Sequence, residues 1–116
     1  MDEKEKIIHF VTGNLYKFQV AEKALEGTGI VLVQEKLDTP EIQSIDVEKI
    51  SSYSAKWAAE KIGKPVTVTD AGYYIETLNG FPGPFIKYIN QWLTSEDLIN
   101  LMVGKTNRKV VVRDSL

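Results

Sequence analysis

The sequence predicts an α/β protein with a mixed, mostly parallel central sheet flanked by helices. Residues 7–11 and 30–33 are short, nearly continuous apolar runs, which are typical of strands covered on both faces. Between these runs, apolar residues recur at helical spacing. A strand, a helix and a strand within about 30 residues form by default a right-handed βαβ unit with a parallel strand pair.

Length and composition are those of an ordinary globular domain. The 116 residues suffice for one domain, 1–116, with its own core. A net charge of −2 gives no general attraction to nucleic acid or to an anionic membrane, so we expect neither partner. There is no cysteine, which excludes disulfides and fits a cytoplasmic location. No apolar run approaches the roughly 20 residues of a membrane helix. Because residues 1–6 are charged with both signs, we expect no signal peptide.

Two longer helices are predicted in the first half of the chain. The first begins near Leu15 and stops near Gly27, and the second lies between an N-cap at Asp46 and a C-cap at Gly63. The stripe of the first helix comprises Leu15, Phe18, Ala21, Glu22 and Leu25. The stripe of the second comprises Val47, Ile50, Ser54, Trp57, Ala58 and Ile62. Residues 37–44 between them are predicted to form a loop.

Residues 66–89 organise the second half of the chain. Residues 66–69 are β-branched and indicate a strand, Asp70 stands at its end, and residues 73–76 form a second extended run. Residues 79–84, Asn-Gly-Phe-Pro-Gly-Pro, predict a rigid loop and neither a helix nor a strand. A strand-end carboxylate beside such a loop can hold an ion or a phosphate. The more frequent alternative is a turn followed by an ordinary surface loop.

The last predicted elements are a short helix and a strand. Residues 94–97, Thr-Ser-Glu-Asp, resemble a capping box, and the helix that follows ends at Gly104. Residues 109–113 indicate a final strand. Three aromatic residues ahead of the helix belong either to the core or to a hydrophobic surface that pairs with another chain. These residues are Phe85, Tyr88 and Trp92.

The turn between the first strand and the first helix, residues 12–17, is a candidate phosphate cradle. Amide groups at a helix N-terminus point beyond the strand, and the helix dipole favours an anion there. Gly13 lets the backbone approach closely, Thr12 and Asn14 add side-chain donors, and Lys17 lies one turn in. The pattern matches neither the Walker nor the dinucleotide-binding motif. The alternative is an Asn14 N-cap with a solvated lysine.

Glu41 and Asp70 are candidate metal ligands. Each acid follows a predicted strand, and Mg²⁺ typically takes one or two carboxylates with substrate phosphates and waters. For Glu41 taken alone, an exposed loop acid is the more frequent alternative. His9 is the only histidine and lies inside an apolar strand, so it is predicted to be a packed, hydrogen-bonded core residue without a catalytic role.

Four motifs occur in one order along the chain. They are Thr12-Gly13-Asn14-x-x-Lys17, Pro40-Glu41-Ile42-Gln43, Thr69-Asp70-Ala71-Gly72 and Leu78-Asn79-Gly80-Phe81-Pro82-Gly83-Pro84-Phe85-Ile86-Lys87. In this combination the chain resembles the inosine triphosphate pyrophosphatase family over nearly all of its length. The resemblance implies the N-terminal part of that family's fold and a homodimer. It also implies Mg²⁺-dependent hydrolysis of ITP, dITP and XTP to the monophosphate and pyrophosphate.

The resemblance further implies roles for individual residues. Asp70 would be a metal ligand or the general base for the attacking water, Glu41 would be a second metal ligand, and Lys17 would neutralise charge in catalysis. Attack would fall on the phosphorus nearest the nucleoside. The implied substrate-binding residues are Thr12, Gly13, Asn14, Lys17, Gly72, Gly80, Phe81, Pro82 and Gly83.

Three positions depart from the family pattern. Thr69 stands where the family usually has an acid, Ala71 where a serine is common, and Ser54 where many members carry a lysine. A neutral hydroxyl does not supply the missing charge, so we expect weaker metal binding or a weaker base. The recognisable pattern breaks off near Val112, before the family's base-binding segments. The alternative to an impaired enzyme is an inactive relative that binds nucleotide weakly or associates with itself through an unpaired sheet edge.

Overall fold

In the computed structural model, which describes residues 6–116, the chain divides into two units. Unit 1 comprises the residues up to Ile42 together with Ser51–Val68. Unit 2 comprises Gln43–Ile50 and Thr69–Leu116. Of residues 1–6, where no signal peptide is expected, only Lys6 belongs to the described part of the chain. Each unit contains its own three-stranded sheet.

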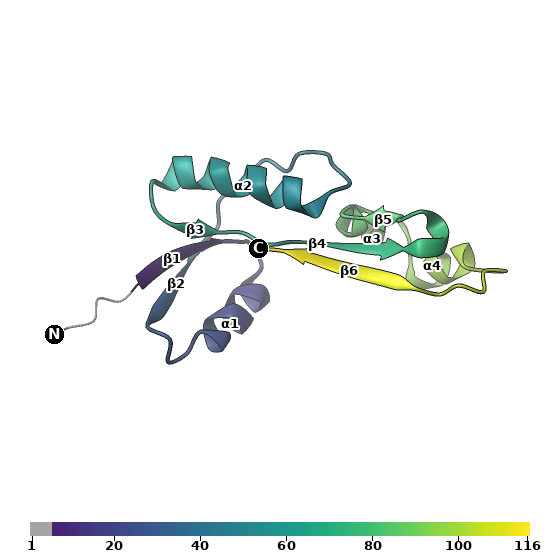
Figure 1. Ribbon diagram of the computed structural model, residues 1–116, viewed down its shortest axis with the longest axis horizontal. Helices are drawn as coiled ribbons and strands as arrows, with labels where there is room; N and C mark the ends of the chain where they lie inside the picture. The colour runs from purple at the N-terminus through teal and green to yellow at the C-terminus, as the bar shows by residue number, and fades with distance from the viewer. Residues whose placement is uncertain (1–5) are drawn as a thin grey trace. The chain divides into compact units, whose positions relative to one another are not determined.

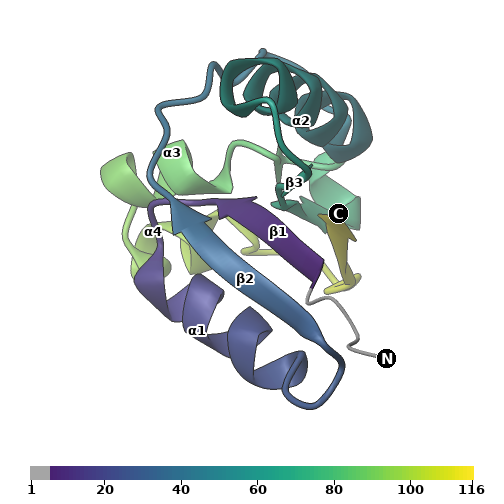
Figure 2. The same ribbon diagram turned by 90° about the vertical axis from the view of Figure 1, so that its left-hand side faces the viewer.

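Unit 1 is built on a parallel sheet in the order β2-β1-β3. Its strands are β1 (Lys6–Val11), β2 (Ile30–Glu35) and β3 (Val66–Thr67). The helix α1 (Leu15–Ala24) connects β1 to β2, which confirms the predicted βαβ unit, and α2 (Val47–Ile62) precedes β3. Figures 1 and 2 show α1 and α2 on opposite sides of this sheet.

The core of unit 1 lies between the sheet and α2. Ala58 of α2 is fully buried and packs with Val11 and Val68. The predicted stripe of α2 is buried or half-buried along its whole length. The predicted apolar stripe of α1 is less buried, because Phe18 is only half-buried and Leu15 is 53% exposed. Only one of the two helices therefore supplies a well-buried face.

His9 confirms its predicted place in the core. Its side chain is buried in β1, and its Nδ1 lies 2.8 Å from Oε1 of Glu35 on β2. Buried polar groups are normally hydrogen-bonded, and Glu35 provides the partner here.

The ends of the two longer helices agree with the sequence signals. Asn14 caps α1 by accepting a hydrogen bond at Oδ1 from the amide of Lys17 (3.1 Å). Asp46 Oδ1 accepts from the amide of Glu48 at the start of α2 (2.9 Å). Beyond the end of α2, Gly63 has φ +69°, a left-handed conformation that favours glycine.

Unit 2 is built on an antiparallel sheet in the order β5-β4-β6. β4 (Asp70–Ile75) pairs along its whole length with β6 (Val110–Ser115), from Asp70 opposite Ser115 to Ile75 opposite Val110. Figure 1 shows β6, in yellow, running alongside β4. The remaining elements of unit 2 are the 3₁₀ helix η1 (Glu76–Leu78), β5 (Pro82–Gly83), α3 (Ile86–Trp92) and α4 (Ser95–Leu101).

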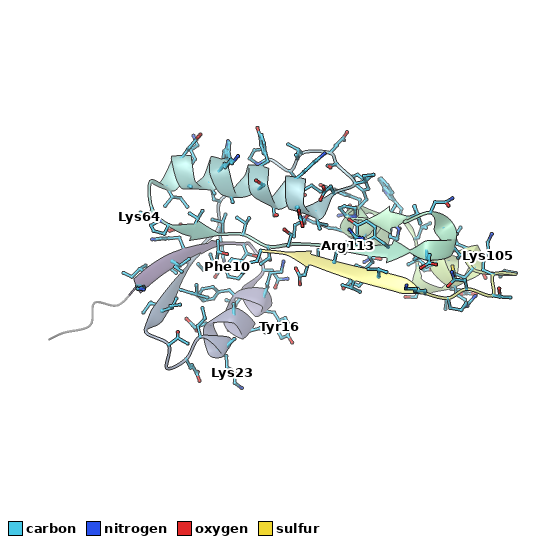
Figure 3. The ribbon with its side chains drawn as sticks, viewed as in Figure 1. Phe10, Tyr16, Lys23, Lys64, Lys105 and Arg113 are labelled. Carbon is cyan, nitrogen blue, oxygen red and sulfur yellow. The ribbon has the colours of Figure 1, made fainter. Side chains whose placement is uncertain are left out.

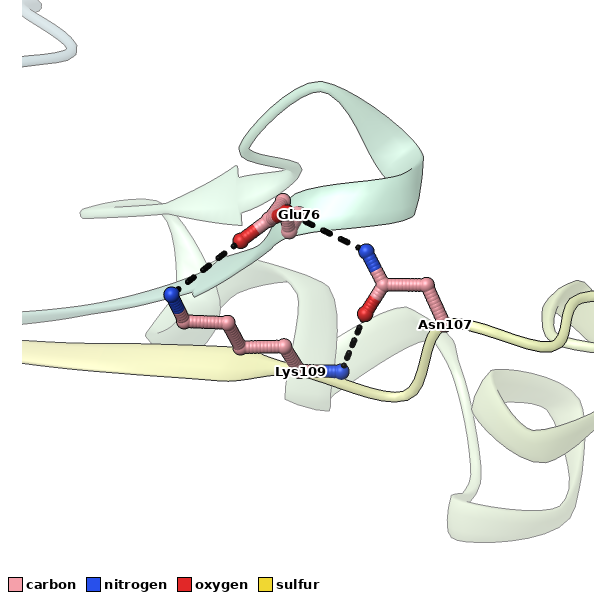
Figure 4. Close-up of polar contacts among 3 residues, drawn as sticks. All are labelled: Glu76, Asn107 and Lys109. Atoms are coloured by element: carbon pink, nitrogen blue, oxygen red, sulfur yellow. Dashed lines mark hydrogen bonds and ion pairs between the residues drawn. The ribbon is translucent and has the colours of Figure 1, made fainter.

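Polar side chains fasten the end of the β4–β6 pair that lies away from Asp70. Figure 4 shows the Glu76 carboxylate between two partners. Asn107 Nδ2 donates to Oε1 at 3.2 Å, and Lys109 Nζ lies 3.5 Å from Oε2. All three side chains are exposed, so each contact contributes little free energy of unfolding. They lie just beyond the last residue pair of the two strands, Ile75 opposite Val110.

The α/β class with its helix-flanked parallel sheet is confirmed, as is the capping box of α4 at Thr94 and Asp97. The prediction that residues 79–84 contain no strand is wrong at Pro82–Gly83, which pairs with β4. A proline is tolerated there because β5 is an edge strand. The helix α3 was not predicted, because its segment is rich in aromatic and β-branched residues.

Among the described residues, no helix combines the length and the apolar composition that crossing a membrane requires.

Candidate active site

The turn from β1 into α1 holds the residues of the predicted phosphate cradle. The amide of Asn14 donates to Oγ1 of Thr12 (3.1 Å), and the Asn14 side chain in turn caps α1. A Cβ built on Gly13 would meet nothing within 4 Å. Packing among the described residues therefore does not require glycine here.

The first turn of α1 presents its side chains to solvent. Figure 3 shows Tyr16 directed away from unit 1 and Phe10 directed into it. Tyr16 is 76% exposed, Phe10 is 3% exposed, and Lys17 is exposed. The structure confirms the N-cap alternative for this turn, and the phosphate cradle stays a prediction. Asn14 is an N-cap and Lys17 is solvated, and both remain accessible to an anion at the helix N-terminus.

Glu41 lies exposed in the loop between β2 and α2. Next to it, the carbonyl of Pro40 accepts a hydrogen bond from Oγ of Ser54 on α2 (3.4 Å). Ser54 is buried, with 7% of its surface exposed. The residue that stands in place of a lysine therefore contacts the loop backbone and brings no charge to it.

Asp70 begins β4 and follows Thr69 directly. Oγ1 of Thr69 is buried and has no hydrogen-bond partner among residues 6–116. A buried oxygen of this kind calls for a water or an ion to satisfy it. This hydroxyl and the carboxylates of Asp70 and Glu41 are hard oxygen donors, which suit Mg²⁺. Nowhere in the described chain do three or more His, Cys, Asp or Glu residues gather into a metal cluster.

The residues predicted to form the site are divided between the two units. Unit 2 contains Asp70, Gly72 and residues 80–83. Unit 1 contains Thr12, Gly13, Asn14, Lys17 and Glu41. Each half is defined by itself, and the assembly of one site from both halves stays a prediction.

In unit 2, three motif glycines surround the ring of Tyr74. A Cβ on Gly72 would lie 2.7 Å from Cε2 of the ring, one on Gly83 would lie 3.3 Å from Cε1, and one on Gly80 would lie 3.6 Å from Cδ1. Gly80 and Gly83 also have positive φ values of +95° and +58°. These glycines therefore make room for a tyrosine ring, and their predicted role in binding substrate stays a prediction.

The Tyr74 hydroxyl donates a hydrogen bond to the carbonyl of Ile45 (2.8 Å). The Arg113 guanidinium lies 5.4 Å from the centre of the ring. These groups border an open hollow of about 710 Å³, which Asp46 and Ser115 also line. Burial raises the pKa of Tyr74, nearby Asp46 adds to the increase, and Arg113 opposes it. At neutral pH the hydroxyl is protonated and acts as a donor.

Sequence reasoning missed Tyr74 and Arg113. One signal was present, since Gly72 and Tyr74 are two residues apart in a strand and so share a face. A glycine in a strand often marks the close approach of another group, and here that group is the ring. For Arg113 there was no local signal, because its neighbour Tyr74 lies far away in the sequence.

The fold is that of an α/β protein, and three of its four motifs lie at the first turn, in the loop after β2 and at the start of β4. The chain belongs to the Ham1 family, whose sequence profile matches residues 8–114. A dITP/XTP pyrophosphatase of Methanopyrus kandleri is 43% identical over 100 residues, which cover 86% of this chain and 53% of that protein. An inosine triphosphate pyrophosphatase of Tuber melanosporum is 40% identical over 97 residues, which cover 84% and 52%.

Solved structures show the same fold. The Ham1 protein of Staphylococcus aureus superposes with a TM-score of 0.69 at 18% identity, covering 94% of this chain and 68% of that one. A nucleoside-triphosphatase, dITP/XTP pyrophosphatase, of Mycobacterium abscessus gives 0.68 at 19% identity, covering 94% and 71%. The chain spans about half the length of the curated relatives it matches.

Proposed function

We propose that this chain carries Mg²⁺-dependent pyrophosphatase chemistry toward the non-standard purine nucleotides ITP, dITP and XTP. The products would be the nucleoside monophosphate and pyrophosphate. The observation that carries the proposal is the match to the Ham1 family over residues 8–114, which include all four motifs. The relatives named above as dITP/XTP pyrophosphatases support the substrate class.

The residues of unit 1 are suited to the phosphates of such a substrate. The N-terminus of α1 offers backbone amides and a positive dipole end, and Lys17 adds a solvated cation on the same turn. Thr12 and Asn14 hold the backbone of this turn. A triphosphate would therefore bind at this end, with its charge offset by the helix and by Lys17.

Glu41 and Asp70 would hold the metal ion. When bound, Mg²⁺ supplies electrostatic stabilisation of the phosphate oxygens and makes the attacking water more acidic. Asp70 is the residue proposed to accept the proton from that water. Thr69 is neutral where the family usually has an acid, so we propose a reduced metal affinity and an activity that needs more Mg²⁺.

The test is pyrophosphate release from ITP, XTP, GTP and ATP over a Mg²⁺ series. We expect release that favours ITP and XTP and that falls about 100-fold or more in Asp70→Asn. Asp38→Asn is the matched control, because Asp38 is an exposed acid in the loop after β2. No release from the folded wild-type chain would contradict the proposal and favour the inactive relative. Equal pyrophosphate release from all four nucleotides would contradict the proposed selectivity for the base and leave the proposed hydrolysis standing.

We also propose that the chain pairs with a second copy through the aromatic surface of α3. Trp92 is 74% exposed and Tyr88 is 42% exposed, so these residues do not serve the core of their own unit. Light scattering should give a dimer for the wild type and a smaller mass for Trp92→Ser. Tyr16→Ser, at an equally exposed aromatic on α1, should leave the mass unchanged. A monomeric wild type would contradict the pairing. The cytoplasmic location stays a prediction.

A further inference from the structure

Thr12, which opens the turn from β1 into α1, is held by hydrogen bonds at each of its polar groups. Its amide donates to the carbonyl of Glu35 (3.0 Å), and its Oγ1 accepts from the amide of Asn14 (3.1 Å). Its carbonyl accepts from Nε2 of Gln34 (3.1 Å). Because a carbonyl oxygen can only accept, the Gln34 group that faces it must be the NH₂. Thr12 is therefore fastened to the end of β2 by two neighbouring residues of that strand.

The bond from Gln34 lies where the parallel sheet of unit 1 ends. β1 pairs with β2 as far as Val11 opposite Glu35, and Thr12 follows this last pair. Gln34 and Thr12 are both half-buried, so water competes less for their hydrogen bond than for one on the open surface. The side chain of Gln34 thus holds the chain at the point where it leaves the sheet.

Fixing the carbonyl of Thr12 also fixes the amide of Gly13. The two groups belong to one planar peptide unit, and in a trans unit the C=O and the N–H point in opposite directions. The bond between Thr12 and Gly13 is trans, so the Gly13 amide points away from Gln34. Gly13 is exposed, and within residues 6–116 its amide donates to no carbonyl or side chain.

Glycine at position 13 makes an anchor of this kind necessary. Glycine has access to more backbone conformations than other residues, and a Cβ at this position would meet nothing within 4 Å. Neither a side chain nor close packing therefore holds Gly13 itself. The direction of its amide depends on the hydrogen bond that Gln34 donates to Thr12.

We propose that Gln34 is a positioning residue for phosphate binding, which directs the Gly13 amide toward the substrate by holding the Thr12 carbonyl. This inference rests on the proposed function, because it assumes that the phosphates bind at residues 12–17. All the residues involved belong to unit 1. Gln34 lies outside the four motifs and acts through Thr12. Its loss should therefore weaken phosphate binding and leave the chemical step unchanged.

The experiment compares Gln34→Met with Gln19→Met in the full chain. Methionine matches glutamine in length but cannot donate a hydrogen bond, and Gln19 is an exposed residue of α1. The probe is inorganic triphosphate without added metal, and its binding is measured by calorimetry and by nuclear magnetic resonance of the backbone amides. We expect Gln34→Met to bind about fivefold more weakly, the order of one lost hydrogen bond, and its Gly13 amide resonance to shift less. Gln19→Met should match the wild type in both.

A second pair of variants decides the question if Gln34→Met does not fold, which circular dichroism checks. Gln34→Glu keeps a polar group of the same size but presents no donor to the Thr12 carbonyl. Gln19→Glu is its control, because it adds the same charge to α1 without touching that bond. Gln34→Glu should weaken the binding of triphosphate more than Gln19→Glu does.

A kinetic measurement separates positioning from general destabilisation. In Gln34→Met the KM for ITP should rise about fivefold, while kcat should stay near that of the wild type. Wild-type affinity for triphosphate in Gln34→Met, or equal losses in the two Glu variants, would overturn the positioning role and leave the proposed function intact. A wild-type chain that hydrolyses ITP but whose Gly13 resonance does not respond to triphosphate would overturn phosphate binding at this turn and the positioning role together. The proposed function itself is tested separately, by pyrophosphate release from the wild type.

Discussion

An alanine at Gly72 would place its Cβ 2.7 Å from Cε2 of Tyr74, much closer than packed carbon atoms approach one another. Gly72 and Tyr74 lie on the same face of β4. The ring of Tyr74 therefore occupies the space that a side chain at position 72 would need. The glycine in the third motif is thus explained by packing within unit 2.

We predict that Gly72→Ala lowers the free energy of unfolding by about 1–3 kcal/mol, because the Tyr74 ring must move away from the new Cβ. The loss should shrink when Tyr74→Ala is combined with it, and the double-mutant cycle should show this coupling. Urea unfolding of the four proteins measures it. Gly13→Ala is the control. Its Cβ meets no neighbour within 4 Å, so its change should stay within about 0.5 kcal/mol. If the effects of Gly72→Ala and Tyr74→Ala simply added, the proposed close contact between residue 72 and the Tyr74 ring would be contradicted.

The pair of His9 and Glu35 should stabilise unit 1. Glu35→Ala leaves a ring nitrogen of the buried His9 without its carboxylate partner, and such a loss costs about 1–3 kcal/mol. The lower part of that range is expected, because the Glu35 side chain is 36% exposed and water can replace it. Thermal unfolding measures the loss. Glu22→Ala, at an exposed acid of α1, should change little. Equal effects of the two variants would rule out a special role for the pair.

The capping box of α4 should show in both a mutation and a pH series. Thr94→Ala removes the side chain that accepts from the Asp97 amide (3.1 Å), and we expect a loss of about 1 kcal/mol. Hydrogen bonds from the backbone and side chain of Thr94 lower the pKa of Asp97. The stabilisation by Asp97 is therefore present above the ordinary carboxyl pKa and lost as pH falls through the lower folded value. The stability difference between the wild type and Asp97→Asn should shrink over that window. A stability difference between the wild type and Asp97→Asn that does not change with pH would contradict the role of Asp97 in the capping box.

The hydroxyl of Tyr74 should lose its proton at a higher pH than the hydroxyl of an ordinary tyrosine. Burial raises its pKa above 10.0, so its contribution to stability is complete below pH 10.0 and is lost as pH rises through the higher folded value. The ultraviolet absorbance titration of the wild type minus that of Tyr74→Phe isolates this group. A difference curve with its midpoint at or below pH 10.0 would argue against a half-buried, hydrogen-bonded hydroxyl.

Much of unit 1 could be predicted because its signals are local. The caps at Asn14 and Asp46, the stop at Gly63 and the buried spacing of α2 all depend on residues within a few positions of one another. The candidate phosphate turn was found in the same way, because the glycine and the polar residues are adjacent.

Unit 2 was harder to predict because its pairings are distant. Asp70 pairs with Ser115, and nothing near either residue states whether their strands are parallel or antiparallel. The bond from Tyr74 to Ile45 spans 29 positions and ends on a backbone carbonyl, which carries no residue-type signal. The polar motifs named the candidate site residues, and the antiparallel sheet shows which residues of unit 2 lie side by side.

The division of the chain has a consequence for fragments of this protein. Unit 2 takes Gln43–Ile50 from the middle of the stretch that otherwise builds unit 1. A fragment starting at Thr69 would carry both halves of the β4–β6 pair but not the carbonyl that Tyr74 binds. Neither unit could be cloned, exchanged or transplanted as one uninterrupted piece of coding sequence. Recombination that shuffles such genes would therefore have to move both units together.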